Sequence, residues 1–294
     1  MPAAYGTCER LSELTLGLVD VPSVSRDEAE ITSFIRDLMP SSLPEAYRQG
    51  NDCTLYLTER DEARPLIVLA GHTDTVPAQA NLPGRIEDGH VFGLGASDMK
   101  GGLAVMIELA RWLDGASPQR QLDAGFLFFS REELPVAESP LPALFQARPG
   151  LDGAALVVVL EPTDNTIQAG CLGNIIATLT FRGESVHSAR PWTGVNAIDR
   201  AVEGLYPLVG RGRREVTIDG LEFYEVVSIT GINGGIADNV VPDEVTCRVN
   251  YRFTPDMTPD EAEQSLSTLV GEAGELRVVS TSPAGAVSAG SPIV

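Results

Sequence analysis

Residues 66–77 read LIVLAGHTDTVP, an unbroken apolar run that ends in a histidine and an aspartate two residues apart. A continuous apolar run is typical of a strand that is covered on both faces, as in parallel sheets. Ligands of open α/β sheets gather at the carboxyl ends of such strands. The stretch therefore predicts a buried strand that delivers His72 and Asp74 to a site at the edge of an α/β sheet.

Strand and helix patterns alternate on both sides of this stretch. They predict three further strands and two helices: strands at 53–58, 124–130 and 154–160, and helices at 31–39 and 103–113. Ser25 to Glu28 has the S-x-x-E spacing of a capping box before the first helix. The alternation predicts an α/β domain whose mostly parallel sheet is flanked by helices.

The pattern changes near Gly173. The predicted order from there is strand, helix, strand, strand, helix, strand: 174–181, 196–209, 223–232, 244–253, about 259–271 and 276–280, with Thr258–Glu261 capping the second helix. This βαββαβ order is typical of a ferredoxin-like α+β domain. We expect a first domain at 1–172, a second at 173–283, and a segment at 284–294 that returns to the first.

Charge and cysteine content narrow the class of protein. With 21 Lys and Arg against 41 Asp and Glu the formal net charge is -20, which argues against binding to nucleic acid or to an anionic membrane. No apolar stretch has the roughly 18–20 residues of a membrane span, and no secretory signal is recognisable. Four widely spaced cysteines indicate reduced thiols and a cytoplasmic location.

Acidic residues follow the other predicted strands. Asp98 lies in the glycine-rich segment 93–102, Glu132 and Glu133 follow the strand at 124–130, and Glu161 follows the strand at 154–160. Carboxylates gathered at one sheet edge repel each other unless cations neutralise them. Zinc accepts imidazole nitrogen and carboxylate oxygen. Together with the histidine at 72, these residues predict a metal site.

Four segments, GHTDTVP (71–77), GLGASDMKGG (93–102), REE (131–133) and EPT (161–163), resemble the aminoacylase and glutamate-carboxypeptidase family of di-zinc hydrolases. The resemblance spans roughly residues 10–285. It implies that 1–172 form the zinc-binding catalytic domain and that 173–283 form a lid and dimerisation domain, so that the protein is a homodimer.

The resemblance also implies the roles of single residues. Four would bind metal, with Asp98 shared by two zinc ions: His72, Asp98, Glu133 and Glu161. Co²⁺ could replace Zn²⁺. Three would be catalytic: Glu132 as general base, Asp74 orienting His72, and His187 stabilising the oxyanion in the partner's site. Four in the lid would bind substrate: Gly234, Gly235, Asn239 and Arg252.

The sequence departs from the family at the second zinc, which takes a histidine from near the C-terminus. The histidines here are His72, His90 and His187, and none lies beyond residue 187. We expect either a fragment or shortened gene product, or a site completed by another chain. In both cases we expect one firmly bound zinc per chain, little activity, and instability from exposed apolar strand edges.

The resemblance is closest to family members of the shorter, actinobacterial type that act on N-succinyl-LL-2,6-diaminopimelate. It implies hydrolysis of that N-acyl amino acid to succinate and LL-2,6-diaminopimelate, a step of lysine and cell-wall precursor synthesis. The alternatives are an acetylornithine deacetylase or related deacylase or carboxypeptidase, and a catalytically impaired member that acts as a binding module. No G-x-S-x-G is present, which disfavours a serine hydrolase.

Overall fold

The computed structural model describes residues 2–116, 120–272 and 274–287. The chain divides into two units, the first extending to Thr166 and the second beginning at Ile167. Each unit has its own sheet and core. Of the segment 284–294, which we expected to return to the first domain, 284–287 are described, and Gly285 there bonds Cys171 of the second unit. Residues 288–294 lie outside the described part.

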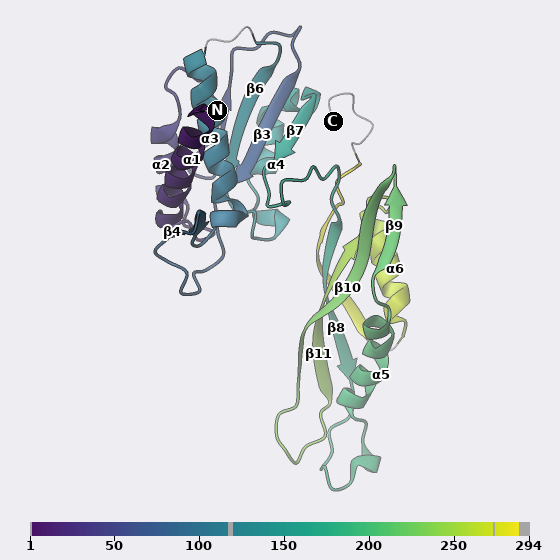
Figure 1. Ribbon diagram of the computed structural model, residues 1–294. Coiled ribbons are helices and arrows are strands. Elements are labelled where there is room, and N and C mark those ends of the chain that lie inside the picture. Colours follow the sequence, from purple (N-terminus) through teal and green to yellow (C-terminus); the bar gives the residue numbers. More distant parts are fainter. Residues whose placement is uncertain (1, 117–119, 273, 288–294) are drawn as a thin grey trace. The chain divides into compact units, whose positions relative to one another are not determined.

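The first unit is built on a five-stranded mixed sheet of order β1-β2-β6-β3-β7 (Figure 1). The strands are β1 Glu45–Gln49, β2 Cys53–Leu57, β3 Leu66–His72, β6 Asp123–Phe129 and β7 Leu156–Val159. As the apolar run predicted, β3 lies inside the sheet, between β6 and β7, and runs parallel to both, while β1 is antiparallel to β2 and β2 to β6. A small hairpin, β4 Arg85–Glu87 and β5 His90–Phe92, stands apart from this sheet.

Helices cover both faces of this sheet, because the apolar side chains of its strands point to both sides. The helices α1 Pro2–Asp20, α2 Ala29–Leu38 and α3 Gly101–Ala116 share one core cluster with Phe126 and Phe128 of β6. On the other face, α4 Leu141–Ala147 packs through Leu144 against Leu127 and Phe129. Three short helical turns lie between these elements: Ala96–Lys100, Val136–Glu138 and Pro149–Gly153.

The predicted capping box before α2 is wrong. The helix begins at Ala29, its N-cap is Glu28, and no side chain caps it. The hydroxyl of Ser25 instead donates to a carboxylate oxygen of Asp74, 2.8 Å away. The spacing of Ser25 and Glu28 predicted a bond within the helix start, but the hydroxyl bonds a residue 49 positions further along the chain.

β7 is less covered than its apolar sequence predicts. Val157, Val158 and Val159 are 51%, 37% and 49% exposed, because among the described residues only β3 pairs with this strand. The continuous apolar run therefore corresponds to an edge strand here, whereas β3 and β6 are the buried strands that such a run normally indicates.

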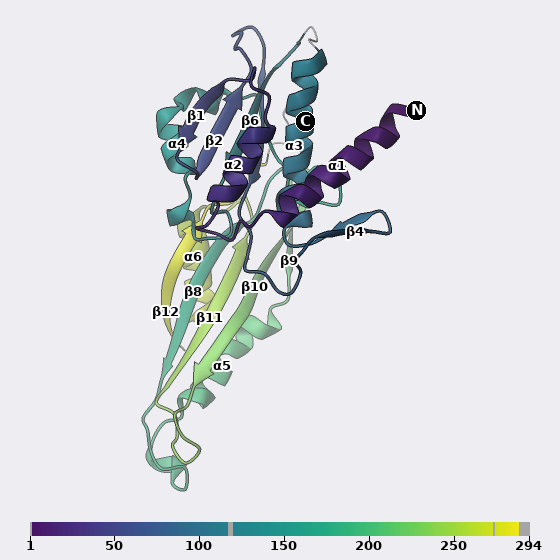
Figure 2. The same cartoon turned by 90° about the vertical axis from the view of Figure 1, so that its left-hand side faces the viewer.

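The second unit is a five-stranded antiparallel sheet of order β12-β8-β11-β10-β9, with both helices on one face (Figure 2). Its elements are β8 Gly173–Arg182, α5 Ala197–Gly210, β9 Arg214–Ile218, β10 Leu221–Gly234, β11 Glu244–Phe253, α6 Pro259–Val270 and β12 Glu275–Ser282, with a turn at Pro191–Thr193. The four strands other than β9 have the ferredoxin-like order. The expected βαββαβ elements are all present, and β9 is an addition.

The helix starts of this unit follow their sequence signals. Thr258 caps α6, with the reciprocal bonds of a capping box to Glu261, and the side chain of Asn196 accepts from the amide of Ile198 at the start of α5. None of the described helices is both long and apolar enough to cross a bilayer.

Candidate metal centre

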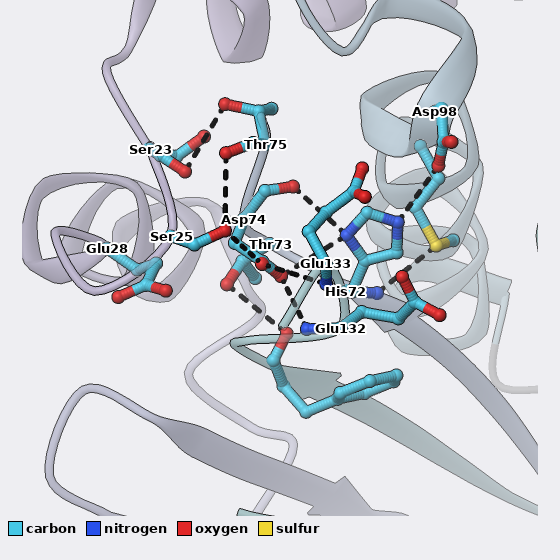
Figure 3. A network of polar contacts seen from close by, with 12 residues as sticks. Ser23, Ser25, Glu28, His72, Thr73, Asp74, Thr75, Asp98, Glu132 and Glu133 are labelled. Carbon is cyan, nitrogen blue, oxygen red and sulfur yellow. Dashed lines mark hydrogen bonds and ion pairs between the residues drawn. The ribbon is translucent and has the colours of Figure 1, made fainter. Parts of the chain in front are cut away.

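His72 is the last residue of the buried strand β3, so its side chain lies at the carboxyl edge of the sheet. Its side chain is 1% exposed, and the ring lies among acidic residues (Figure 3). Nε2 lies 2.9 Å from Oδ1 of Asp98 and 3.8 Å from Oε1 of Glu161. Nδ1 lies 3.0 Å from the backbone oxygen of Asp74. That contact leaves Nε2 as the nitrogen that faces the two carboxylates.

Asp98 is held in the irregular turn Ala96–Lys100, immediately before α3. A glycine is needed at position 95, because its φ is +75° and an added Cβ would lie 2.7 Å from Cγ2 of Thr75. The side chains of Met99 and Lys100, which follow Asp98, are buried and anchor the turn. The Met99 sulfur accepts from the amide of His72 at 3.1 Å, and the Lys100 ammonium donates to the carbonyl of Val21 at 2.8 Å. The turn is thereby fixed to both β3 and the end of α1.

Glu161 follows β7 and completes a group of three. One ligand atom from each of His72, Asp98 and Glu161 lies within 4.8 Å of the other two. Tetrahedral catalytic zinc sites use three protein ligands of the imidazole and carboxylate type and leave a fourth position open. The three residues therefore fit a zinc ion by their donor chemistry and by their convergence.

The charged groups around His72 shift one another's pKa values. Burial opposes protonation of His72, but hydrogen bonds to Asp74 and Asp98 outweigh it and raise the histidine pKa to about 9. Burial also raises the pKa of Glu161, and the carboxylates of Asp98 and Glu132 raise it further, against the opposing effect of His72. Both shifts follow from the convergence of acidic groups, an arrangement that a bound cation would neutralise.

Asp74 lies behind the imidazole and links it to the turn after β6. Its carboxylate accepts the amides of Glu132 at 3.0 Å and Glu133 at 3.3 Å, and the hydroxyl of Ser25 at 2.8 Å. Its Oδ1 also lies 3.4 Å from Nδ1 of His72. Figure 3 shows the two glutamates beside the histidine ring.

Glu133, the ligand predicted for the second metal, is not part of the three-residue group, the sole such group among the described residues. Burial raises the pKa of its carboxyl group, followed by the charges of Asp98 and Glu132. Glu132 is exposed on the same turn.

The predicted catalytic and substrate-binding residues of the second unit fall into two places. His187 is exposed and pairs with Val240, and the amide of Ser188 donates to the carbonyl of Asn239. Gly234 and Gly235 lie at the end of β10, on the hairpin that carries Asn239. Arg252 is exposed at the far end of β11, opposite Val226.

Sequence reasoning did not identify three residues that support this site. Ser25 bonds the carboxylate of Asp74, the Met99 sulfur bonds the amide of His72, and Lys100 ties the Asp98 turn to the carbonyl of Val21. Met99 and Lys100 fall inside the motif that carries Asp98, so the motif located them without indicating their bonds. The spacing around Ser25 was visible, but it was interpreted as a helix cap.

Residues 68–291 match peptidase family M20/M25/M40, which is more than half of the chain, and the chain belongs to this family. It is 38% identical over 254 residues to the DapE protein of Mycobacterium tuberculosis strain H37Rv, covering 86% of this chain and 70% of that protein. It is 37% identical over 260 residues to the succinyl-diaminopimelate desuccinylase of Corynebacterium glutamicum, covering 87% and 70%.

Solved structures show the same fold. Aminopeptidase PepT from Bacillus cereus superposes with a TM-score of 0.74 at 21% identity, covering 97% of this chain and 79% of that one. The M20 family metallo-carboxypeptidase Sso-CP2 from Sulfolobus solfataricus superposes with a TM-score of 0.70 at 16% identity, covering 90% and 76%.

Proposed function

We propose that the chain is a metal-dependent amide hydrolase that converts N-succinyl-LL-2,6-diaminopimelate and water to succinate and LL-2,6-diaminopimelate. The observation that carries the proposal is the convergence of His72, Asp98 and Glu161 at the carboxyl edge of β3, beside the Glu132 turn. The substrate is supported by two desuccinylase-type relatives at 37–38% identity over most of the chain.

We propose Zn²⁺ as the metal, with Co²⁺ able to replace it, held by His72, Asp98 and Glu161. Asp98 and Glu133 are the candidates for a second ion. The metal supplies Lewis-acid polarisation of the scissile carbonyl and activation of water. To bind the metal, His72 must present Nε2 to the site. The contacts of its Nδ1 with Asp74 hold the imidazole in that orientation.

Glu132 is the proposed general base. Its amide is fixed by Asp74, and its side chain is exposed beside the three-residue group, where it can accept a proton from water and return it to the leaving amine. His187 is the proposed donor to the oxyanion, and Gly234, Gly235, Asn239 and Arg252 are the proposed substrate contacts. Arg252 suits a substrate carboxylate, because a guanidinium binds both oxygens.

We propose that the chain functions as a homodimer in which His187 serves the partner's site. Along β11, the partners of Gly234 and Val226 are Val245 and Arg252. These two residues are about 24 Å apart at roughly 3.4 Å per residue. The hairpin beside His187 and the position of Arg252 thus lie at opposite ends of one rigid sheet, which favours their use in two different sites.

Two further parts of the proposal concern organisation and location. The first unit is the proposed metal-binding catalytic domain and the second the proposed lid and dimerisation domain. A cytoplasmic location is supported by the four free cysteines, since thiols stay reduced there.

The test is an assay of the zinc-loaded chain on N-succinyl-LL-2,6-diaminopimelate, N-acetylornithine and a dipeptide, with Glu132→Gln as the matched variant. We expect slow turnover with a preference for the succinyl substrate, and we expect the variant to retain zinc but to lose roughly 100- to 10,000-fold in kcat, the range for a general base. Preference for N-acetylornithine would identify a deacetylase instead. Zinc binding without turnover of any substrate would favour a binding module.

A further inference from the structure

The segment before α2 is fastened to the residues that follow β3. The amide of Thr75 donates to the carbonyl of Ser23 at 2.8 Å, and the amide of Ser25 donates to the carbonyl of Thr75 at 3.0 Å. These two backbone bonds hold Ser25 against the chain next to Asp74. Its hydroxyl then donates to Oδ2 of Asp74 at 2.8 Å.

The Asp74 carboxylate is almost completely buried, with 1% exposure of the residue, so its orientation depends on its protein partners. Oδ1 accepts the amide of Glu132 and lies 3.4 Å from Nδ1 of His72. Oδ2 accepts the hydroxyl of Ser25 at 2.8 Å and the amide of Glu133 at a longer 3.3 Å. The shortest bond to the carboxylate is therefore the one from Ser25.

We propose that Ser25 is a positioning residue that sets the orientation of Asp74, and through it both the His72 imidazole and the backbone of the Glu132–Glu133 turn. A hydroxyl bonded to a buried carboxylate makes a charge-assisted hydrogen bond, stronger than one between neutral groups. Without it, Oδ2 keeps only the longer bond to Glu133, and the carboxylate can rotate. Both groups that bond Oδ1 then lose their fixed partner. The catalytic consequence rests on the proposed role of Glu132.

Ser23 provides a matched control in the same segment. It is 1% exposed, and its hydroxyl has no hydrogen-bond partner among the described residues (Figure 3). Ser23→Ala removes a buried hydroxyl two residues away without touching Asp74. Ser25→Thr keeps the hydroxyl at position 25 and is the rescue variant.

The experiment measures two quantities in the four proteins, neither of which requires turnover: amide hydrogen exchange of the peptide containing Glu132 and Glu133, and zinc affinity by competition with a chelator. For Ser25→Ala we expect exchange at these amides to accelerate by about tenfold and zinc affinity to fall by roughly 10- to 100-fold, as for other groups that orient metal ligands. Ser23→Ala should behave as the wild type, and Ser25→Thr should recover most of both losses.

Wild-type exchange and zinc affinity in Ser25→Ala would overturn the proposal. Equal changes in Ser23→Ala and Ser25→Ala, accompanied by a lower melting temperature in both, would also overturn it, since the effect would then be general loosening of the segment. Because no step of the reaction is measured, failure of the proposed desuccinylase activity would appear separately, in the substrate assay.

Discussion

At the level of single residues, burial separates the four cysteines into two pairs. Cys8 and Cys171 are exposed, whereas Cys53 and Cys247 are buried. Burial raises the pKa of the Cys53 thiol to about 12, with a smaller contribution from Asp52, and it also raises that of Cys247. The thiolate is the reactive form, so an elevated pKa and lack of access protect the buried pair together.

We therefore expect two fast-reacting thiols in the folded chain between pH 7 and about 9, and four after unfolding. Cys53 should stay protonated until the pH approaches its elevated pKa. A colorimetric thiol titration measures this. As controls, Cys8→Ser should lower the native count to one, and Cys53→Ser should leave it at two. Rapid modification of three or more native thiols would contradict the assignment.

The role of Ser25 could not be predicted from its neighbours in the sequence. Its spacing to Glu28 fits a capping box, yet its hydroxyl bonds Asp74, while Glu28 accepts the amide of Arg26. A serine hydroxyl can bond a helix amide or a distant carboxylate equally well. Only the folded chain decides which partner is within reach.

At the level of elements, the join between β8 and β11 depends on one glycine. Gly173 begins β8, and a Cβ added there would lie 2.1–2.4 Å from three ring carbons of Phe253, the residue paired with it on β11. Phe253 is fully buried, so its ring has little freedom to move. Close packing makes such overlap costly.

We expect Gly173→Ala to lower the free energy of unfolding by about 1–3 kcal/mol, the usual cost of overpacking a core. The urea midpoint of the second unit's transition measures it. Gly210→Ala is the control, because it lies in the same unit and nothing lies within 4 Å of a Cβ at that position. A midpoint for Gly173→Ala equal to that of the control would show that the ring can yield.

The elements predicted best were those with one dominant pattern. The buried strands β3 and β6 were identified because each is a continuous apolar run. The helix α6 was identified because it starts with a complete capping box. The prediction missed β9, which has only two apolar residues over five positions at the edge of its sheet. The long helix α1 was missed as well, since its apolar residues follow no strong helical period.

At the level of the whole molecule, α5 has apolar residues on two faces. One face packs in the core of its unit, and the other exposes Ile198, Val202, Tyr206 and Val209 at 41%, 63%, 77% and 70%. These four positions follow the spacing of one helical face. An exposed apolar stripe of this kind is typical of an interface, and it is the surface that we expect the proposed homodimer to bury.

We expect Val202→Glu to convert the dimer to a monomer, because it places an unpaired charge in the centre of that stripe. Sedimentation velocity across a concentration series measures the change. Val279→Glu, at a 55% exposed position on the edge strand β12, is the control and should remain dimeric. A wild type that is monomeric at every concentration would contradict the proposed dimer.

The alternation of strands and helices, the change to a βαββαβ unit, and the residue types that follow β3, β6 and β7 could all be predicted from the sequence. These features depend on local periodicity and on chemistry that a few neighbouring residues carry. Three features became visible in the folded chain alone: the exposed edge formed by β7, the bond from Ser25 to Asp74, and the position of Arg252 at the opposite end of its sheet from the hairpin beside His187. The physical reason is that each of these depends on which distant segments pack together, and hydrogen bonds and burial over such separations have no counterpart in local spacing.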